Sequence, residues 1–505
     1  MIHSPAAIWI GSTAAAEVAV LVWAAMLLFQ RRGWTFAEAA AYGIICTMML
    51  LSFVFQTAML TRMVFLSPVL EVVLIAVAAV VLLQGKPVSL VWGPLRGALR
   101  QHPIPAGLLL IAMGFLFVQA MIAPSGFGQW EALWPVLDLQ RWLDFCRTGN
   151  SGSFNQAILP HLVLRHHIRF GLGIFGFLAY LAVGFASYAL ARRYAWPPTA
   201  ITVSLVVLSA PRLVLHSVTP GVEITTAAAA VFVLLALYRC VEQPSPVDLV
   251  LMLLGISFCI SAGSMGFVLP FILLGLAGLV LYRRHGGRFW WSLAAASRRW
   301  LLFAAIPMAV FAQPWMLFCP DPAVGMSAST TPAWNADGLV GGLANLLRYL
   351  LEALDPTPGI EHLVDAVWGI SLSSVVQWLS DSLLSPVFHG RGAAVDFHVQ
   401  WASTPFLSWF GPLAVILVGP AWLKALVRGP RRLKAVAVAL AGYLYLASLL
   451  PAWQPGNGRL FMPFWCCAGF MVAFLLPPWR FTRSGRLGLQ GISAALLLYA
   501  CWQIG

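Results

Sequence analysis

Long apolar segments separated by short polar breaks dominate this chain. Each segment is close to the roughly 20 residues that a helix needs to cross a bilayer. About fourteen of them can be recognised, at residues 8–30, 35–56, 64–84, 104–123, 169–191, 197–216, 222–240, 248–263, 265–282, 300–318, 405–427, 434–452, 460–477 and 487–503. The pattern predicts an all-α integral membrane protein, a polytopic bundle of about 13–14 transmembrane helices.

Two long polar segments interrupt the bundle. We therefore describe residues 1–505 as a single integral-membrane domain in five consecutive parts. These are N-terminal spans (1–123), a first loop (124–168), central spans (169–318), a second loop (319–404) and C-terminal spans (405–505). Loops of this length usually carry function.

Both loops contain segments that suit the membrane surface. The first loop is rich in Trp, which favours the edge of a bilayer. In the second loop, apolar residues recur at helical spacing in two runs, 343–354 and 363–383. We expect two amphipathic helices on or near the membrane surface. The alternative is that their apolar faces form the core of a small external subdomain.

The composition excludes a soluble protein. Of the 505 residues, 60% are hydrophobic and only 9% are charged, whereas soluble chains carry about 25% charge. The net charge of +13 does not indicate a nucleic-acid partner, because the basic residues are scattered between apolar spans. The eight cysteines lack zinc-site spacing. Cys146 and Cys319 fall in the two long loops, where they could form a disulfide.

The basic residues are distributed unevenly about the predicted spans. The first span has no Lys or Arg before it and is followed by Arg31 and Arg32, which predicts a permanent span with its N-terminus outside. Alternating spans then place 21 of the 30 Lys and Arg on the cytoplasmic side and 12 of the 17 acids in or beside external loops. The asymmetry places the active face on the non-cytoplasmic side.

Two acids stand at the external edge of predicted spans. Glu131 follows one span by a few residues, and Glu223 begins another. A carboxylate that is partly removed from water can act as a general base. The alternative is that each stabilises a helix N-terminus, where negative charge is favoured.

Cationic and imidazole side chains are predicted on the same face. Arg459, Arg212 and Arg165 could bind a lipid phosphate, because guanidinium matches phosphate oxygens in fork geometry. Ordinary interfacial snorkelling is the alternative. His389 and His398 could ligate a metal or transfer protons, although a loop histidine can also simply be solvated. No P-loop, dinucleotide fingerprint, HExxH or GxSxG motif is present.

Four short motifs occur in a characteristic order. They are Gln129-Trp130-Glu131-Ala132-Leu133 with Arg141-Trp142-Leu143, Ala210-Pro211 with Val222-Glu223-Ile224, the pair His389 and His398, and Trp453-Gln454-Pro455 with Arg459-Leu460-Phe461-Met462-Pro463. Together with the span pattern, they resemble the GT-C superfamily of membrane glycosyltransferases, which includes protein O-mannosyltransferases and aminoarabinose transferases.

The resemblance implies a fold and an activity. It implies a multi-pass enzyme of the bacterial inner membrane that moves a sugar, with inversion, from a polyprenyl-phosphate donor to a lipid, glycan or protein acceptor on the periplasmic face. Glu131 would be the base, Glu223 would orient the acceptor or share a metal, and Arg459, Arg212 and Arg165 would hold the donor phosphate. The pocket would be lined by Trp130, Arg141, His389, His398 and Trp453. The resemblance also allows a divalent metal, with Glu131, Glu223 and His389 as candidate ligands. Besides the donor and the acceptor, membrane lipids are the expected partners. The oligomeric state is left open.

The sequence also departs from the family pattern. Glu replaces Asp at positions 131 and 223, and Gly390-Arg391 replaces an acidic pair after His389. A changed acceptor, altered metal use or lost catalysis would each fit these departures. Two other functions therefore remain open: a non-catalytic subunit of an envelope-polysaccharide assembly, and a lipid or polysaccharide transporter.

The predicted topology can be tested by labelling. Cysteines introduced at Ser151 and Ser327 should react with an impermeant thiol reagent from the periplasmic side, because the basic loops flanking both segments lie on the other side. Labelling of either position only from the cytoplasmic side would contradict the topology.

Overall fold

Helices make up nearly all of the structure. The computed structural model describes residues 5–61, 66–84, 100, 103–122, 173–218, 222–262, 268–312, 335–353, 360–369, 371–388, 391–393, 396–399, 410–454, 457–476 and 482–504. Within these ranges every named element is a helix, and extended pairing is limited to an isolated bridge between Ala393 and Trp453. The expected all-α class is confirmed for the described residues.

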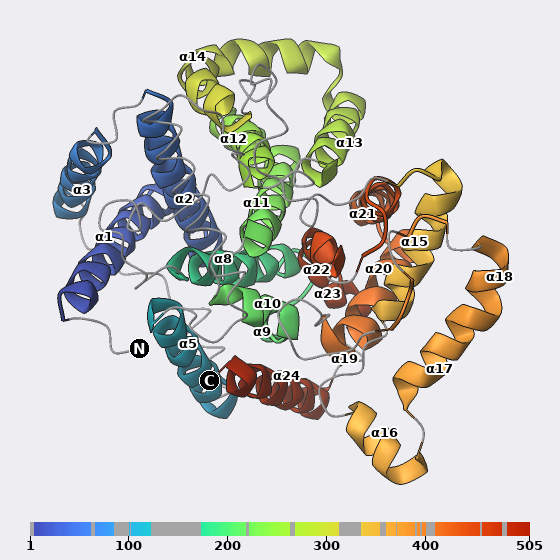
Figure 1. Cartoon of the computed structure of the whole chain (residues 1–505). Coiled ribbons are helices and arrows are strands. Elements are labelled where there is room, and N and C mark those ends of the chain that lie inside the picture. Colours follow the sequence, from blue (N-terminus) through green and yellow to red (C-terminus); the bar gives the residue numbers. More distant parts are fainter. Residues whose placement is uncertain are drawn as a thin grey trace.

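The helices follow the apolar segments in order (Figure 1). The N-terminal part contains α1 (Pro5–Gln30), α2 (Phe36–Leu60), α3 (Leu66–Gln84) and α5 (Pro103–Ile122). The central part contains α8 (Ile174–Ala191), α9 (Pro197–Leu208), α10 (Pro211–Ser217), α11 (Val222–Glu242), α12 (Pro246–Ala262), α13 (Val268–His285) and α14 (Gly287–Ala312). The second loop contains α15 (Gly338–Glu352), α16 (Ile360–Trp368), α17 (Leu372–Leu379), the π-helix η2 (Ser380–Leu384) and α18 (Ser385–Phe388). The C-terminal part contains α19 (Gly411–Leu413), the π-helix η3 (Ala414–Val418), α20 (Gly419–Arg428), α21 (Arg431–Leu449), the 3-10 helix η4 (Asn457–Phe461), α22 (Met462–Gly469), α23 (Val472–Leu475) and α24 (Arg483–Ile504).

Helix α11 lies at the centre of the bundle (Figure 1). Every side chain from Ile224 to Tyr238 is buried, as expected for a helix that is apolar on all sides. It packs against α2, α8, α12, α13 and α22. The run Ala227–Ala230 is fully enclosed, and such small side chains let neighbouring helix backbones approach closely.

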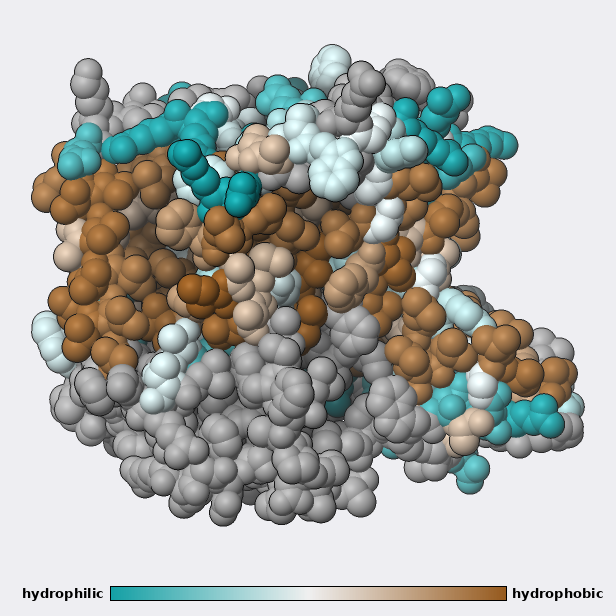
Figure 2. Space-filling view, turned by 90° about the horizontal axis from the view of Figure 1, so that it is seen from above, coloured by the Kyte–Doolittle hydropathy of each residue, from teal (hydrophilic) through white to brown (hydrophobic). Residues whose placement is uncertain are grey.

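The structure supports a membrane protein with helical spans. Among the described residues, six helices are long and apolar enough to cross a bilayer: Ser12–Gln30, Phe36–Thr57, Ile174–Ala191, Glu223–Glu242, Gly411–Arg428 and Arg431–Leu449. Each of the fourteen predicted segments contains helix, but the others are shorter, broken or less apolar. Figure 2 shows a hydrophilic rim above a broad hydrophobic band on the side of the molecule in view.

Two segments that we expected to be continuous spans are broken. The segment 197–216 forms α9 and α10, which are bent by 72° relative to one another. Pro211 begins α10, and proline cannot donate the backbone hydrogen bond that would continue α9. The segment 460–477 is likewise divided among η4, α22 and α23.

The leucines of α15 differ in burial. The buried face of the helix contains Gly341, Gly342 and Asn345 and packs against α21. Leu343 is exposed, whereas Leu346 is partly buried against the core. A position at the membrane surface and the core of an external subdomain both remain predictions for this run.

We expected the second amphipathic run, 363–383, to form one helix, but the structure divides it into two. Gly369 ends α16 with a φ of +63°, a left-handed conformation that favours glycine, and α17 starts three residues later. Trp368 and Trp378 are exposed on the two helices. The lobe at the right of Figure 2 separates hydrophobic from hydrophilic residues, as helices lying at an interface would.

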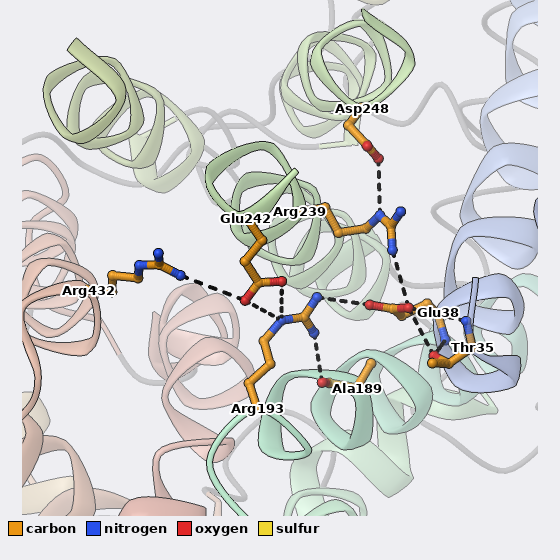
Figure 3. Close-up of polar contacts among 8 residues, drawn as sticks. All are labelled: Thr35, Glu38, Ala189, Arg193, Arg239, Glu242, Asp248 and Arg432. Carbon is orange, nitrogen blue, oxygen red and sulfur yellow. Dashed lines mark hydrogen bonds and ion pairs between the residues drawn. The ribbon is translucent and has the colours of Figure 1, made fainter. Parts of the chain in front are cut away.

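Ion pairs join the central helices at one end of α11 (Figure 3). Glu38 on α2 accepts hydrogen bonds from Arg193 at 2.9 Å and from Arg239 at 3.3 Å. Arg239 also pairs with Asp248 at 3.3 Å, and Arg193 pairs with Glu242 at 3.1 Å. Burial opposes the charged form of Arg193, but the carboxylates of Glu242 and Glu38 outweigh it and hold the pKa of Arg193 above its usual value.

Local contacts at helix starts help to fix two of these acids. The Thr35 N–H donates to Glu38 Oε2 at 3.3 Å, and the Glu38 N–H donates to Thr35 Oγ1 at 3.4 Å. These reciprocal contacts form a capping box, which satisfies backbone N–H groups at a helix start. At the start of α12, the Asp248 N–H donates to Ser245 Oγ, and the Ser245 hydroxyl donates to the Asp248 carboxylate.

The ion pairs predict an unequal effect of two substitutions. Glu38→Gln should lower the free energy of unfolding by about 2–3 kcal/mol, because it removes the carboxylate shared by two largely buried arginines. Glu242→Gln should cost less, because the Glu242 side chain is 34% exposed and solvent screens its charge. Thermal and denaturant unfolding of the detergent-solubilised variants would measure both. An equal or larger loss for Glu242→Gln would contradict this assignment.

Candidate functional site

A carboxylate, a guanidinium and an imidazole meet at the other end of α11. Arg459 Nη1 lies 3.3 Å from Glu223 Oε1, and His216 Nδ1 lies 3.9 Å from Glu223 Oε2. The three residues come from η4, α11 and α10, and Glu223 is 236 positions from Arg459 in the sequence. The structure thus brings together two of the predicted site residues, Glu223 and Arg459, and adds His216.

The break between α9 and α10 explains part of this geometry. Arg212 and His216 are four residues apart on α10, so they share a helix face. Both are buried, with 1% and 2% of their surface exposed. Arg212 also acts electrostatically on Glu223. If α10 continued straight on from α9, the face with Arg212 and His216 would not point toward Glu223.

Glu223 occupies the first turn of α11. A negative charge is stabilised there by the helix dipole, so the simple structural explanation for this residue applies. The same carboxylate faces Arg459 and His216. The helix terminus, Arg459 and His216 therefore all meet at one carboxylate.

Several contacts hold the short helix that carries Arg459. The Tyr443 hydroxyl donates to the Leu460 carbonyl, and Asn457 Nδ2 donates to the Ala452 carbonyl at 3.2 Å. The ring of Phe461 packs on Tyr349 of α15, with centroids 4.8 Å apart. The backbone of η4 is thus fixed while the Arg459 side chain remains 41% exposed.

Trp453 connects this region to the second loop. It is fully buried, its backbone N–H donates to the Gly392 carbonyl at 2.8 Å, and its ring packs against Phe397 at 4.9 Å. His398 follows Phe397 but is exposed. The structure therefore places His398 in a segment that contacts Trp453, and it shows no contact of His398 with Glu223 or Arg459 among the described residues.

Helix α15 carries a polar clasp that the sequence analysis missed. Asn345 Nδ2 donates to the carbonyls of Ser448 and Pro451 at 3.3 and 3.1 Å. Arg348 Nη1 donates to Asn345 Oδ1 at 2.9 Å and to the Arg391 carbonyl at 2.7 Å. The clasp joins the second loop to the chain just before Trp453. The sequence did contain a signal for this contact, because Asn345 and Arg348 are two polar residues spaced three apart in a leucine-rich helix.

Close backbone packing accompanies the clasp. Gly392 has a φ of +77°, and a Cβ added to it would collide with the backbone of Gly341. Asp337 also accepts a hydrogen bond from the Gly392 N–H. Glycine is therefore required at position 392.

The other predicted site residues lie outside the described chain. These are Glu131, Trp130, Arg141, Arg165 and His389, together with Cys146 and Cys319. Among the described residues, no three His, Cys, Asp or Glu side chains are grouped to hold a metal ion. Since Glu131 and His389 are two of the three candidate ligands, the metal remains a prediction. Glu17 and Glu71 are buried on the mutually packed helices α1 and α3.

Comparison of the chain with protein-family models, with curated proteins and with solved structures finds no match.

The site predicts that Arg459 contributes little to stability. Arg459→Gln should change the free energy of unfolding by less than about 1 kcal/mol, because solvent screens a pair whose arginine is 41% exposed. Asn345→Leu should cost about 2 kcal/mol, because it deprives two carbonyls of their donor in a buried position. Unfolding measurements on both variants provide the comparison. A greater loss from Arg459→Gln would mean that Arg459 is chiefly structural.

Proposed function

We propose that the chain is a membrane glycosyltransferase that takes a sugar from a polyprenyl-phosphate donor. The supporting observation is the meeting of Glu223 and Arg459, which belong to two separate motifs of the GT-C resemblance. A reaction centre must bring such distant groups together. The acceptor would be a lipid, glycan or protein at the periplasmic face of a bacterial inner membrane.

The described residues can perform one part of this reaction directly. Arg459 is exposed enough to meet a ligand, and only one of its five N–H donors is used in its contact with Glu223. Its remaining donors can bind phosphate oxygens. Arg212 adds a second positive charge nearby. Arg459 would bind the donor phosphate at the end of α11, and the buried Arg212 would contribute its positive charge from behind.

Transfer itself requires a base. The acceptor hydroxyl would attack the anomeric carbon while the bond from that carbon to the phosphate oxygen breaks. Polyprenyl phosphate would leave with the bonding electron pair, and the acceptor proton would pass to the carboxylate of Glu131. Glu223 would orient the acceptor, and Arg459 would stabilise the charge of the departing phosphate.

One observation favours a transporter as the second candidate. The two arginines of the site, Arg212 and Arg459, lie at two interrupted spans, α9–α10 and η4–α22–α23. Transporters often bind anionic substrates at discontinuous helices. The same arginines could therefore hold a lipid phosphate during its movement between leaflets, without any bond being broken.

The catalytic proposal predicts the effect of removing the base. Glu131→Gln should reduce transfer from polyprenyl-phosphate sugars by about a hundred- to ten-thousand-fold, because it keeps the size of the side chain but removes its basicity. Glu131→Asp should retain more activity than Glu131→Gln. Release of polyprenyl phosphate by the reconstituted protein, measured with a panel of such donors, gives the rate. Asp365→Asn is the matched control, since Asp365 is an exposed acid on α16.

The same assay separates the phosphate contact from the base. Arg459→Gln should raise the KM for the donor more than it lowers kcat. Wild-type turnover in Glu131→Gln would show that Glu131 is not the base. Movement of a labelled lipid phosphate between leaflets, with no sugar transfer by the wild type, would replace the enzyme with the transporter.

A further inference from the structure

An apolar slot opens between three helices at the Glu242 end of α11. Side chains of α11, α13 and α21 line it, including Leu237, Leu276 and Ala435. It is an open groove rather than a closed cavity, and about 380 Å³ of space lies within it and in its open mouth. The slot is separated by the length of α11 from Glu223, so it is not part of the candidate active site.

Arg432 is the charged residue in the lining of this slot. Its side chain is 44% exposed, and its nearest described partner, Glu242, lies 3.9 Å away. Glu242 is already bound by Arg193 Nε, which lies 3.1 Å from both carboxylate oxygens. Figure 3 shows Arg432 approaching Glu242 from the side opposite Arg193 and Arg239. Arg432 is therefore held loosely and can turn toward an anion.

The second polar side chain in the lining is occupied elsewhere. The Tyr238 hydroxyl lies 2.8 Å from the hydroxyl of Tyr194, so Tyr238 presents its ring to the slot. The other lining residues are apolar. The slot thus combines a hydrocarbon-lined space with a single guanidinium at its edge.

The surrounding surface favours a negatively charged ligand. Arg428, Arg431 and Lys434 are exposed on α20 and α21 beside Arg432, and Arg283 is exposed near the end of α13. Basic clusters next to spaces between membrane helices suit anionic lipid head groups. Charge complementarity therefore selects an anionic lipid over a zwitterionic one.

We propose that this slot binds an anionic phospholipid, with one acyl chain between α11, α13 and α21 and the phosphate on Arg432. The apolar lining would pack against the acyl chain, and the guanidinium would donate hydrogen bonds to phosphate oxygens, which would distinguish this lipid from bulk lipid. The lipid would lie in the leaflet at the Glu242 end of the bundle, which the charge distribution predicts to be cytoplasmic.

Native mass spectrometry of the purified full-length protein can test the site. The protein would be equilibrated with detergent micelles containing phosphatidylglycerol or phosphatidylcholine, and separately with glycerol phosphate. We expect one retained phosphatidylglycerol per chain, several-fold less phosphatidylcholine, and no retention of glycerol phosphate. Arg432→Gln should weaken phosphatidylglycerol retention about fivefold, the effect of one basic residue near a lipid head group.

A second variant fills the slot instead of changing its charge. Ala435→Phe should reduce the retention of phosphatidylglycerol because the added ring occupies the space of the acyl chain. Val438→Phe is its control, since Val438 is exposed on the same helix and is not in the lining. Arg32→Gln is the control for charge, since Arg32 is exposed in the turn after α1 and is not in the lining. Thermal unfolding of each variant would confirm that the bundle is intact.

The outcomes separate the alternatives. Loss of the lipid in Arg432→Gln and Ala435→Phe, with retention in both controls, supports the site. Equal retention in all four variants means that the lipid is bound elsewhere and overturns the proposal. Equal retention of phosphatidylcholine and phosphatidylglycerol by the wild type also overturns it, because the guanidinium would then play no part in selection.

Discussion

The burial of α11 is the constraint on which the rest of the structure depends. A helix that is apolar on every side gains nothing from one orientation over another through hydrophobicity alone, because lipid and protein interiors are similarly apolar. Its position must be fixed by packing and by its ends. The alanine run at 227–230 allows close contact with neighbours, and the two ends carry the charged groups: Glu223 at one, Arg239 and Glu242 at the other.

The charged side chains at the two ends of α11 differ in burial and in pairing. At the Glu242 end, Glu38 accepts from two arginines whose side chains are 14–15% exposed, and such buried, mutually satisfied charges are sensitive to the loss of any partner. At the Glu223 end, the arginine partner is 41% exposed and contacts Glu223 through one N–H group. The first arrangement fixes helices relative to one another. The second leaves a cation accessible, as a ligand-binding group requires.

The sequence predicted much of the fold because its strongest signals are local. Apolar runs and basic turns placed a helix in every predicted segment, and the charge pattern assigned Arg193, Arg239 and Arg432 to one side, where the structure brings them together. The sequence pattern did not predict where helices break or which distant residues come into contact. Pro211 breaks a span inside an apolar run, and Gly369 divides an amphipathic run through its backbone conformation. The partners of Glu38 are 155 and 201 positions away, a separation at which no local pattern indicates contact.

The sequence predicted which residues belong to the candidate site, but not the contacts that bring them together. Glu223 and Arg459 were selected as separate motif residues, and their ion pair depends on the bend before α10 and on the fixing of η4 by Tyr443 and Asn457. Asn345 and Arg348 extend this chain of contacts to Arg391 in the second loop. Any displacement of α15 would therefore act on the segment that precedes Trp453 and, through Phe461, on η4. Helix α15 and the backbone that carries Arg459 are therefore joined by a continuous series of contacts, although they lie about a hundred positions apart in the sequence.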